Sequence, residues 1–408
     1  MNYQETLDFL NIELPVFQRD GAEVLELKLD RTLQIMFYLG DPHKAFKSVH
    51  VAGTNGKGSV SHITASVLQS AGYKVGLYTS PHLKDFRERI RINGNCISED
   101  RVVAFVERHS GMIDDLKPSF FELTVAMAFD YFASQAIDIA VIEVGMGGRL
   151  DSTNVIIPEL SVITNISFDH QAFLGDTISK IAFEKAGIIK PSVPVVIGEY
   201  QEEALSVFEK KANIQQSELI KAFECVPPYW FSDREEFDLQ GPYQPKNCLT
   251  VYAAIQQLRK QGWAISETAL EKGMKNAASS TGLIGRWQWV TPRLLCDTAH
   301  NAAGLAYVLK RLSELEYSYL HIVLGVVSDK DLTEILPLFP KSAIYYFVAP
   351  SIKRALAADN LQQQAQSYGL IGNTFSSVLK GLEAAKHASK SKDLIFVGGS
   401  TFTVAEIL

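Results

Sequence analysis

The sequence predicts a two-domain α/β protein in which each domain has a mainly parallel sheet. Short runs rich in β-branched residues alternate with helical patterns over most of the chain, as they do where crossover helices join parallel strands. A glycine-rich segment, residues 53–59, stands between one such run and a helical pattern. A less regular stretch interrupts the alternation in the second half of the chain, and the alternation then returns.

The first half of the chain contains several predicted strands. They are residues 48–53, 74–80, 137–145, 160–167 and 193–198. After the first of them, apolar residues recur with helical period from Val60 to Ala71, and Gly72 is a typical C-terminal cap. A second helical pattern runs from Phe121 to Phe132. These segments predict helices packed on a parallel sheet.

The stretch from about residue 200 to 290 is less regular. We interpret segments 225–233 and 239–247, which contain proline, glycine and aromatic residues, as strands and turns rather than βαβ units. The strands predicted after this stretch are residues 294–301, 319–327, 343–350 and 393–400. They indicate a smaller, Rossmann-like C-terminal domain. We place the boundary near residues 281–285, which gives domains 1–284 and 285–408.

Composition and charge exclude several classes of protein. The net charge is −7, from 39 Lys and Arg against 46 Asp and Glu, which argues against sequence-independent binding to nucleic acid. The cysteines are too far apart for a zinc site or a disulfide scaffold, and the N-terminal residues lack the pattern of a signal peptide. No apolar run reaches the roughly 18 residues of a membrane span. We therefore expect a cytoplasmic protein with no membrane or nucleic-acid partner.

Segment 53–59, GTNGKGS, has the features of a phosphate-binding loop. Glycines allow backbone N–H groups to converge on an anion, and the following helix directs its positive N-terminal end at the same place. Lys57 would reach the β and γ phosphates, and Ser59 would lie near the metal or phosphate. The usual pattern has glycine where this chain has Val51. A tight turn with a solvated lysine is the alternative, but the agreement of strand, loop and helix favours a P-loop ATPase-like first domain.

Acidic and imidazole groups stand at the ends of two predicted strands. Glu143 ends the third strand, and Asp169 and His170 follow the fourth. Because the carboxyl ends of parallel strands share one edge of a sheet, we expect these groups to bind magnesium or phosphate there. The alternatives are an ion pair between Glu143 and Arg149 and a structural role for His170.

Lys185 is predicted on the inward face of a helix that begins near Thr177. It follows Ile178 by seven residues, so its stem shares the face of Ile178 and Ile181. Burial would lower the pKa of the amine and leave it able to react with carbon dioxide, giving a carbamate. The alternative is a packed stem whose ammonium group reaches water or pairs with Glu184.

Together these motifs resemble those of the folylpolyglutamate synthase/dihydrofolate synthase family, within the Mur ligase superfamily, over nearly the whole chain. The matching segments are 50–60, 79–83 (TSPHL), 120–124 (FFELT), 143–154 (EVGMGGRLDSTN), 166–190, 285–288 (GRWQ), 297–301 (DTAHN) and 329–331 (DKD). One departure is Ala302, because the family often has proline after the AHN triplet. Residues 200–240 match weakly.

The resemblance implies roles for individual residues. The nucleotide would be bound by Asn55, Gly56, Lys57, Gly58 and Ser59, and from the far side of the domain interface by Asn247, Arg286 and Asp297. Magnesium would be bound by Ser80, Glu143, His170 and the carbamate of Lys185. The pterin-bearing substrate would contact Phe121, Glu122, Arg149, Leu150 and Asp151. Catalysis would depend on Lys57, His170, Lys185 and His300, the last close to the phosphates and the incoming amino acid.

The resemblance also implies a reaction: ATP-dependent addition of L-glutamate to dihydropteroate or to a folate through an acyl phosphate, by a monomer that uses ATP and a pair of Mg²⁺ ions. Segment GGRLDSTN is similar to that of bacterial enzymes that make both additions, which favours a bifunctional enzyme. A peptidoglycan Mur ligase is a weaker match, because the phosphate loop begins about fifty residues into the chain and leaves no room for a UDP-sugar domain before it. A non-catalytic ATP-binding module would not need Glu143, His170 and Lys185 beside Lys57.

Overall fold

The structure is a computed structural model that describes residues 1–15, 28–232 and 235–408. The chain divides into two compact units. Unit 1 comprises Met1–Asp238 and Gln244–Leu283, and unit 2 comprises Leu239–Tyr243 and Ile284–Leu408. The short segment Leu239–Tyr243 thus belongs to unit 2, although the chain returns to unit 1 after it.

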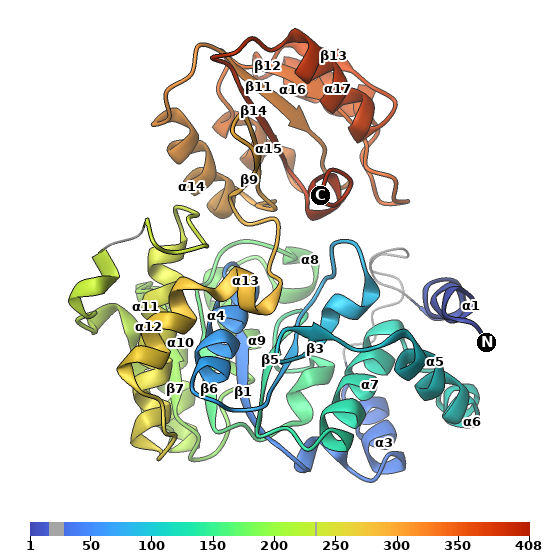
Figure 1. Cartoon of the computed structure of the whole chain (residues 1–408), viewed down its shortest axis with the longest axis vertical. Helices are drawn as coiled ribbons and strands as arrows, with labels where there is room; N and C mark the ends of the chain where they lie inside the picture. Colours follow the sequence, from blue (N-terminus) through green and yellow to red (C-terminus); the bar gives the residue numbers. More distant parts are fainter. Residues whose placement is uncertain (16–27, 233–234) are drawn as a thin grey trace. The chain divides into compact units, whose positions relative to one another are not determined.

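Unit 1 is built on an eight-stranded sheet within the described residues, in the order β4-β3-β2-β5-β1-β6-β7-β8 (Figure 1). The strands are β1 Lys47–Ala52, β2 Val75–Tyr78, β3 Ile90–Ile92, β4 Asn95–Cys96, β5 Ile139–Glu143, β6 Leu160–Ile163, β7 Val195–Ile197 and β8 Leu219–Lys221. In this spatial order, the neighbouring strands from β2 through β5, β1, β6 and β7 to β8 are parallel. At the other edge, the pairs β2–β3 and β3–β4 are antiparallel. The expected mainly parallel sheet is confirmed.

The helices of unit 1 pack on this sheet or on one another. They are α1 Tyr3–Asp8, η1 Phe9–Glu13, α3 Asp30–Tyr38, η3 Pro42–Lys44, α4 Lys57–Ser70, η4 Phe86–Arg89, α5 Glu99–Arg108, α6 Ser110–Leu116, α7 Phe120–Ser134, η5 Ser152–Val155, α8 Gln171–Leu174, α9 Ile178–Ala186, α10 Glu202–Gln215, η6 Ala222–Glu224, η7 Tyr229–Ser232, α11 Gln244–Lys260, α12 Glu267–Lys275 and α13 Ala277–Thr281. One buried cluster joins α7 with α3 and α5, and another joins α9 and α10 with β6 and β7. The helices predicted from Val60, from Phe121 and from near Thr177 are present as α4, α7 and α9, and α4 is followed by Gly72 at φ +94°.

Residues 244–247, which the sequence had suggested to belong to strands and turns, instead begin helix α11, and α12 follows it in the same irregular stretch. Pro245 lies in the first turn of α11, where a missing N–H costs nothing, so it begins the helix instead of preventing it. In α12, Gly273 permits close contact with α4, since a Cβ there would lie 2.4 Å from the Cα of Val67. The strand predicted within 225–233 is also wrong, because Tyr229–Ser232 is a 3₁₀ turn; Asp233 lies outside the described residues.

Unit 2 has a six-stranded sheet among the described residues, in the order β13-β12-β11-β14-β10-β9 (Figure 1). Its elements are β9 Gln288–Thr291, β10 Leu294–Cys296, α14 Ala302–Ser313, β11 Leu320–Leu324, α15 Leu332–Ile335, η8 Leu336–Leu338, β12 Ile344–Phe347, α16 Ala358–Gln366, β13 Gly372–Thr374, α17 Val378–Ala388, β14 Leu394–Gly398 and α18 Thr401–Ala405. Only the edge pair β9–β10 is antiparallel in this sheet as described. The predicted smaller α/β domain is therefore confirmed.

Across the described ranges, 1–15, 28–232 and 235–408, no helix combines the length and apolar character that a membrane crossing needs.

Candidate functional site

The phosphate-like loop begins at Gly53, directly after β1. Val51 still lies within the strand, which explains why glycine is not needed there. Gly53 adopts φ +145°, and a Cβ on it would lie 1.8 Å from Thr164 Oγ1. Gly56 caps α4 at φ +83°, and a Cβ on it would lie 2.4 Å from Asn247 Oδ1. Both glycines are therefore required by backbone conformation and by space.

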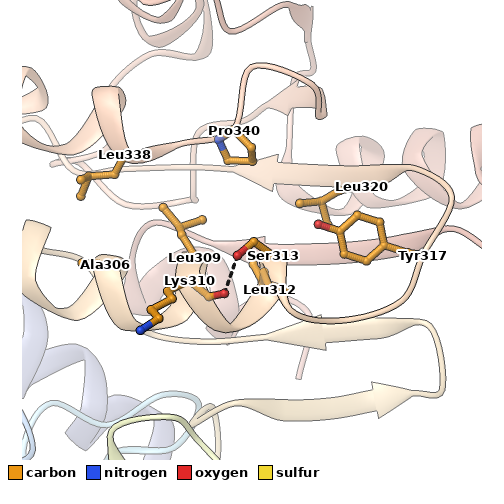
Figure 2. Close-up of a pocket in the computed structure, with 9 residues that line it drawn as sticks. All are labelled: Ala306, Leu309, Lys310, Leu312, Ser313, Tyr317, Leu320, Leu338 and Pro340. Atoms are coloured by element: carbon orange, nitrogen blue, oxygen red, sulfur yellow. Dashed lines mark hydrogen bonds between the residues drawn. The ribbon is translucent and has the colours of Figure 1, made fainter.

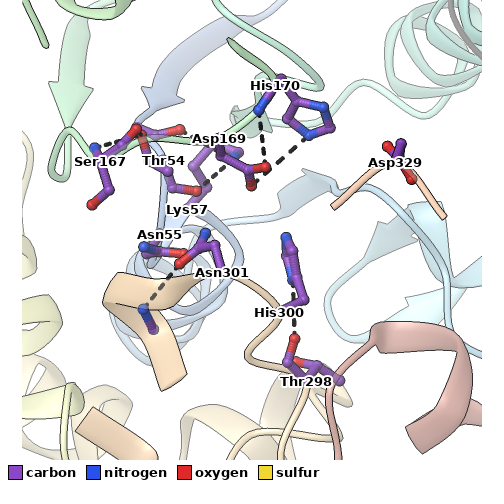
Figure 3. A network of polar contacts seen from close by, with 12 residues as sticks. Thr54, Asn55, Lys57, Ser167, Asp169, His170, Thr298, His300, Asn301 and Asp329 are labelled. Atoms are coloured by element: carbon purple, nitrogen blue, oxygen red, sulfur yellow. Dashed lines mark hydrogen bonds and ion pairs between the residues drawn. The ribbon is translucent and has the colours of Figure 1, made fainter. Parts of the chain in front are cut away.

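The segment that follows β6 braces this loop. Asn165 Oδ1 accepts the Asn55 N–H at 3.0 Å, and Asn165 Nδ2 donates to the Asn55 carbonyl at 3.1 Å. The Thr54 hydroxyl donates to the Ser167 carbonyl at 3.2 Å and accepts the Ser167 N–H at 3.0 Å (Figure 3). Asn165 was missed from the sequence, although it stands two residues after β6, at the same edge of the sheet where Glu143 ends β5.

Lys57 and Ser59 stand at the start of α4. Lys57 Nζ donates to the carbonyls of Gly53 and Thr54, both at 3.1 Å, which keeps the ammonium group at the loop. Ser59 is buried, and its hydroxyl oxygen accepts a hydrogen bond from Gln244 Nε2 at 3.1 Å.

Asn247 also belongs to unit 1, which corrects the expectation that it lies across the domain interface. Its Nδ2 donates to Gln244 Oε1 at 2.9 Å, and Gln244 in turn reaches Ser59, so both amides stand beside the loop. The signal for Gln244 was present, because it is the first residue of a buried helix that immediately follows a proline- and glycine-rich turn.

Glu143 and Ser80 meet at the carboxyl edge of the sheet. Glu143, only 4% exposed, is the last residue of β5, and its Oε2 accepts the Ser80 N–H at 3.1 Å. The structure pairs Arg149 with Glu184, at 3.0 Å, which does not support the alternative of an Arg149 partner for Glu143. A buried carboxylate at a strand end next to a phosphate-type loop is the kind of hard oxygen donor that magnesium selects.

His170 begins α8 in the left-handed conformation, at φ +51°. Its backbone N–H donates to Asp169 Oδ1 at 2.9 Å, and its ring Nε2 lies 4.0 Å from Asp169 Oδ2 (Figure 3). Nowhere in the described residues do three His, Cys, Asp or Glu side chains gather into a closed metal cage. Glu143 and Ser80 still fit magnesium, because this ion prefers oxygen ligands and commonly takes one or two carboxylates besides water and phosphate oxygens. His170 offers it an imidazole nitrogen instead.

Lys185 points inward from α9, as the sequence predicted. It is 3% exposed, and its Nζ donates to the Gly53 carbonyl at 2.9 Å, so it reaches the same loop as Lys57. The pKa of this amine is lowered to about 7, mainly by burial and also by the Lys57 charge, while Asp169 and Asp151 oppose the shift. Glu184 pairs with Arg149, so the suggested Lys185–Glu184 pair is wrong.

Of the residues expected at the pterin-bearing substrate, Phe121 and Glu122 begin α7. The Phe121 ring packs edge-on against Tyr78, with centroids 6.2 Å apart. The Glu122 carboxylate accepts both the N–H and the hydroxyl of Ser119 at 2.8 Å and pairs with Arg31 at 3.2 Å. Glu122 is therefore occupied in capping its helix, whereas Phe121 contributes an apolar surface.

Arg149, Leu150 and Asp151 lie on the loop that follows β5. Arg149 stacks on the Phe183 ring at 5.6 Å in addition to its ion pair, and Leu150 is half-buried. Asp151 is buried, which raises the pKa of its carboxyl, although hydrogen bonds from Thr153 counteract the shift. The loop thus carries one exposed cation and one buried carboxylate within three residues.

In unit 2 the expected nucleotide residues surround Asp297. This carboxylate is 1% exposed and accepts the Tyr243 hydroxyl at 2.6 Å and the backbone N–H of Trp287 and of Ala299 at 2.7 Å. Burial raises the pKa of Asp297, and the Arg286 charge opposes the shift. Tyr243 was missed from the sequence because it reaches unit 2 from a segment that interrupts unit 1.

His300 follows Asp297 on the same connection, between β10 and α14. Its Nδ1 lies 3.1 Å from the Thr298 carbonyl oxygen (Figure 3). Asn301, the next residue, caps α14 by accepting the Gly304 N–H at 2.9 Å. The AHN triplet therefore starts a helix without the proline that often follows it, since Ala302 is the first helical residue.

A cavity of about 340 Å³ in unit 2 lies apart from these residues (Figure 2). Its walls are mainly apolar and come from α14, η8 and the start of β11. Leu320 begins β11, whereas Asp297 follows the last residue of β10, and the strands between them run parallel. The cavity is therefore at the opposite end of the sheet from Asp297 and His300, and no predicted site residue lines it.

Comparison with known proteins agrees with this geometry. Residues 51–224 match the model of the Mur ligase middle domain, and residues 285–401 match that of the Mur ligase glutamate ligase domain. The chain is 34% identical over 409 residues to the dihydrofolate synthase/folylpolyglutamate synthase of Bacillus subtilis, covering 93% of this chain and 94% of that protein. It is 33% identical to a probable bifunctional folylpolyglutamate synthase/dihydropteroate synthase of Haloferax volcanii, of which it spans only 50%.

Solved structures show the same similarity. E. coli FolC in complex with DHPP and ADP superposes with a TM-score of 0.84 at 29% identity, covering 100% of this chain and 97% of that one. Other solved bifunctional folylpolyglutamate synthase/dihydrofolate synthases hold Mn and AMPPNP, in one case together with L-glutamate.

Proposed function

Because the chain belongs to the folylpolyglutamate synthase/dihydrofolate synthase family of ATP-dependent glutamate ligases, we propose that it joins L-glutamate to dihydropteroate and to reduced folates. The observation that carries this proposal is the meeting of three groups at one loop. Lys57 and Lys185 both donate to the Gly53 carbonyl, and Gly53 follows β1, whose neighbour β5 ends in Glu143. A phosphate-binding cation, a buried amine and a buried carboxylate are thereby held at one edge of a rigid sheet.

The nucleotide would be bound by the loop Asn55–Ser59 and by residues of unit 2. The N–H groups at the start of α4 and the positive end of the helix favour phosphate binding. The Lys57 ammonium group would reach the phosphate by giving up its hydrogen bonds to two carbonyl oxygens of the loop. Arg286 and Asp297 would contact the nucleotide from unit 2, where one Arg286 Nη atom is buried without a hydrogen-bond partner among the described residues. We assign ATP binding to domain 1–284 and glutamate ligation to domain 285–408.

Magnesium would be held by Glu143, Ser80 and His170, with a second ion held through Lys185 as its carbamate. When bound, the ions offset negative charge on the phosphate groups of ATP. Lys185 suits carbamate formation because a buried amine with a pKa of about 7 is largely neutral just above neutral pH. The nitrogen of the neutral amine attacks carbon dioxide and releases one proton, so the side chain changes from a neutral amine to an anion.

The chemistry would proceed in two steps. The carboxylate of the pterin-bearing acid attacks the γ phosphorus of ATP, which forms an acyl phosphate and releases ADP, while Lys57 offsets charge on the transferring group. The neutral amine of L-glutamate then attacks the acyl carbon, phosphate leaves and an amide is formed. His300 would stand near the phosphates and the incoming amino acid. The braced loop contributes by holding its N–H groups in place before the nucleotide arrives.

The pterin-bearing substrate would contact Phe121, Arg149, Leu150 and Asp151. Phe121 offers a ring face beside Tyr78, and the Asp151 carboxylate offers hydrogen-bond acceptors in a buried setting. Glu122 would act indirectly, because its carboxylate holds the first turn of α7 and thereby the position of Phe121. We further propose, from the family resemblance, that the enzyme is a cytoplasmic monomer.

The test is release of ADP that depends on L-glutamate and on a pterin acid. Dihydropteroate and tetrahydrofolate are supplied separately, with labelled glutamate to detect the amide. Turnover with both supports the bifunctional assignment, turnover with one limits it, and turnover with neither overturns the proposed function. A heavy-oxygen label in the acid's carboxylate must appear in the released phosphate if an acyl phosphate forms, and its absence would contradict the two-step scheme.

A further inference from the structure

A buried histidine on the central strand β1 is connected by hydrogen bonds to Asp151. His50 Nε2 lies 2.9 Å from Thr153 Oγ1, and Thr153 Oγ1 lies 2.5 Å from Asp151 Oδ1. His50 and Thr153 are 0% exposed, and Asp151 is 6% exposed. None of the steps assigned above uses His50 or Thr153.

The chemistry of the three groups fixes the direction of these hydrogen bonds. Thr153 has a single hydroxyl hydrogen, which it donates to the Asp151 carboxylate. Its oxygen must therefore accept from His50, so the ring of His50 carries its hydrogen on Nε2. Burial, with a smaller contribution from the Lys190 charge, lowers the pKa of His50 to about 3, and the ring stays neutral in this tautomer at physiological pH.

Asp151 closes the loop that follows β5. Its Oδ1 also accepts the Thr153 N–H at 3.0 Å, and its Oδ2 accepts the Met146 N–H at 2.8 Å. Donors on both sides thus set the orientation of the Asp151 carboxylate. One of them, the Thr153 hydroxyl, is itself oriented by a residue outside the loop, His50. The shortest contact of the set is the one that His50 directs.

The far side of the loop is held independently. Lys190 Nζ donates to the Asn154 carbonyl at 2.8 Å. Asn154 Nδ2 donates to the carbonyls of Arg149 and Gly187 at 3.1 Å, which ties the loop to the end of α9. Because these bonds do not pass through Thr153, loss of the Thr153 hydroxyl should reorient the Asp151 carboxylate without releasing the whole loop.

We propose that His50, acting through the Thr153 hydroxyl, is a positioning residue that fixes the Asp151 carboxylate for the pterin ring of the substrate. This inference rests on the proposed function. A pterin ring carries amino and ring N–H groups, which are donors suited to a carboxylate held in one orientation. The hydrogen-bonded series His50–Thr153–Asp151 contributes to substrate recognition and not to phosphate transfer. Its loss should therefore raise KM for the pterin acid and leave KM for ATP unchanged.

The test uses two matched pairs of variants. Thr153→Val keeps the shape and removes the hydroxyl, while Thr153→Ser keeps the hydroxyl. His50→Met removes the ring donor, while His50→Gln keeps an N–H donor on a chain of similar length. For each full-length variant, KM for dihydropteroate, KM for ATP and kcat are measured, and the melting temperature is recorded.

Thr153→Val should raise KM for dihydropteroate about tenfold or more, equivalent to about 1.4 kcal/mol, with KM for ATP and kcat within about twofold of the wild type. Thr153→Ser should restore a low KM. His50→Met should raise the same KM less than Thr153→Val does, because Thr153 can still donate, and His50→Gln should restore it. Should Thr153→Val fold poorly, the His50 pair decides the question by the same readout.

The inference is overturned if Thr153→Val and Thr153→Ser have equal KM values for dihydropteroate, or if the variants raise both KM values together, as general loosening would do. Failure of the proposed function looks different. In that case the wild-type enzyme itself releases no ADP in a manner that depends on L-glutamate and a pterin acid.

Discussion

Burial of Lys185 should make the unfolding free energy depend on pH. The amine has a pKa of about 7 in the folded chain and an ordinary value of 10.5 when exposed. Between these values the unfolded chain binds more protons than the folded one, so the unfolding free energy rises with pH in this window. The loss of stability caused by burying the Lys185 amine is fully present below pH 7 and is gone above about pH 10.5.

The magnitude follows from the two pKa values. Burying Lys185 costs about 4 kcal/mol at pH 7 and about 2 kcal/mol at pH 9 by proton linkage. Lys185→Met has a side chain of similar length and no charge, so its own contribution does not change with pH. The variant should therefore be more stable relative to the wild type at pH 7 than at pH 9, and this difference should shrink by about 2 kcal/mol.

The assay is urea unfolding at pH 7, 8 and 9 in buffer that contains a chelator and no carbon dioxide. Lys180→Met is the control, because Lys180 lies on the same helix with a side chain 63% exposed. Bicarbonate added at pH 8 should stabilise the wild type, since the carbamate forms on the folded chain, and should not affect Lys185→Met. A difference between wild type and Lys185→Met that stays constant from pH 7 to 9 would refute the lowered pKa.

Three further changes test the site. Lys57→Ala should abolish glutamate-dependent ADP release. It should change the unfolding free energy by only about 1 kcal/mol, because the lost Nζ group makes hydrogen bonds only to two loop carbonyls among those described. Retained ADP release would contradict the assignment of Lys57 as the phosphate-binding cation. Gly56→Ala should weaken binding of an ATP analogue about tenfold or more by calorimetry, because the new Cβ would meet Asn247. Gly72→Ala is the control, at a similar φ but in open space, and should leave the affinity unchanged. Equal affinities of the two variants would contradict the steric argument. Tyr243→Phe should remove one donor from buried Asp297 and lower the unfolding free energy of unit 2 by about 1–3 kcal/mol, and an unchanged urea midpoint would show that this bond is dispensable.

The periodicity of apolar residues predicted the buried strands and the inward face of helix α9. The strand that ends at Glu143 is apolar up to its last residue, which is typical of strands buried on both faces. The strand before Gly53 is buried from Ser48 onward, although it also carries His50. The inward position of Lys185 followed from its spacing on α9 alone. Its acceptor could not be predicted in the same way, because Gly53 is 132 residues away in the sequence.

The failures come from residues whose partners are set by tertiary structure. Residues around Pro245 were interpreted as strands and turns because proline and glycine outweighed the helical spacing of Val251, Ile255 and Leu258, all of which are buried on α11. Asn247 was placed across the domain interface, yet α11 returns to unit 1 and brings it to Gly56. A segment that leaves a unit for a few residues and returns gives no local signal.

The convergence of Lys57 and Lys185 on the Gly53 carbonyl limits what a substitution at either residue can show. The Lys57 charge is one cause of the lowered pKa of Lys185, so Lys57→Ala removes a phosphate-binding cation and also raises that pKa. A more strongly protonated Lys185 reacts less readily with carbon dioxide, so part of the lost activity would come from a missing carbamate. Lys57→Arg keeps the charge and separates the two effects: the pH dependence of stability attributed to Lys185 should persist in Lys57→Arg and weaken in Lys57→Ala. If it persists equally in both, burial alone sets the pKa of Lys185, and the two lysines act independently.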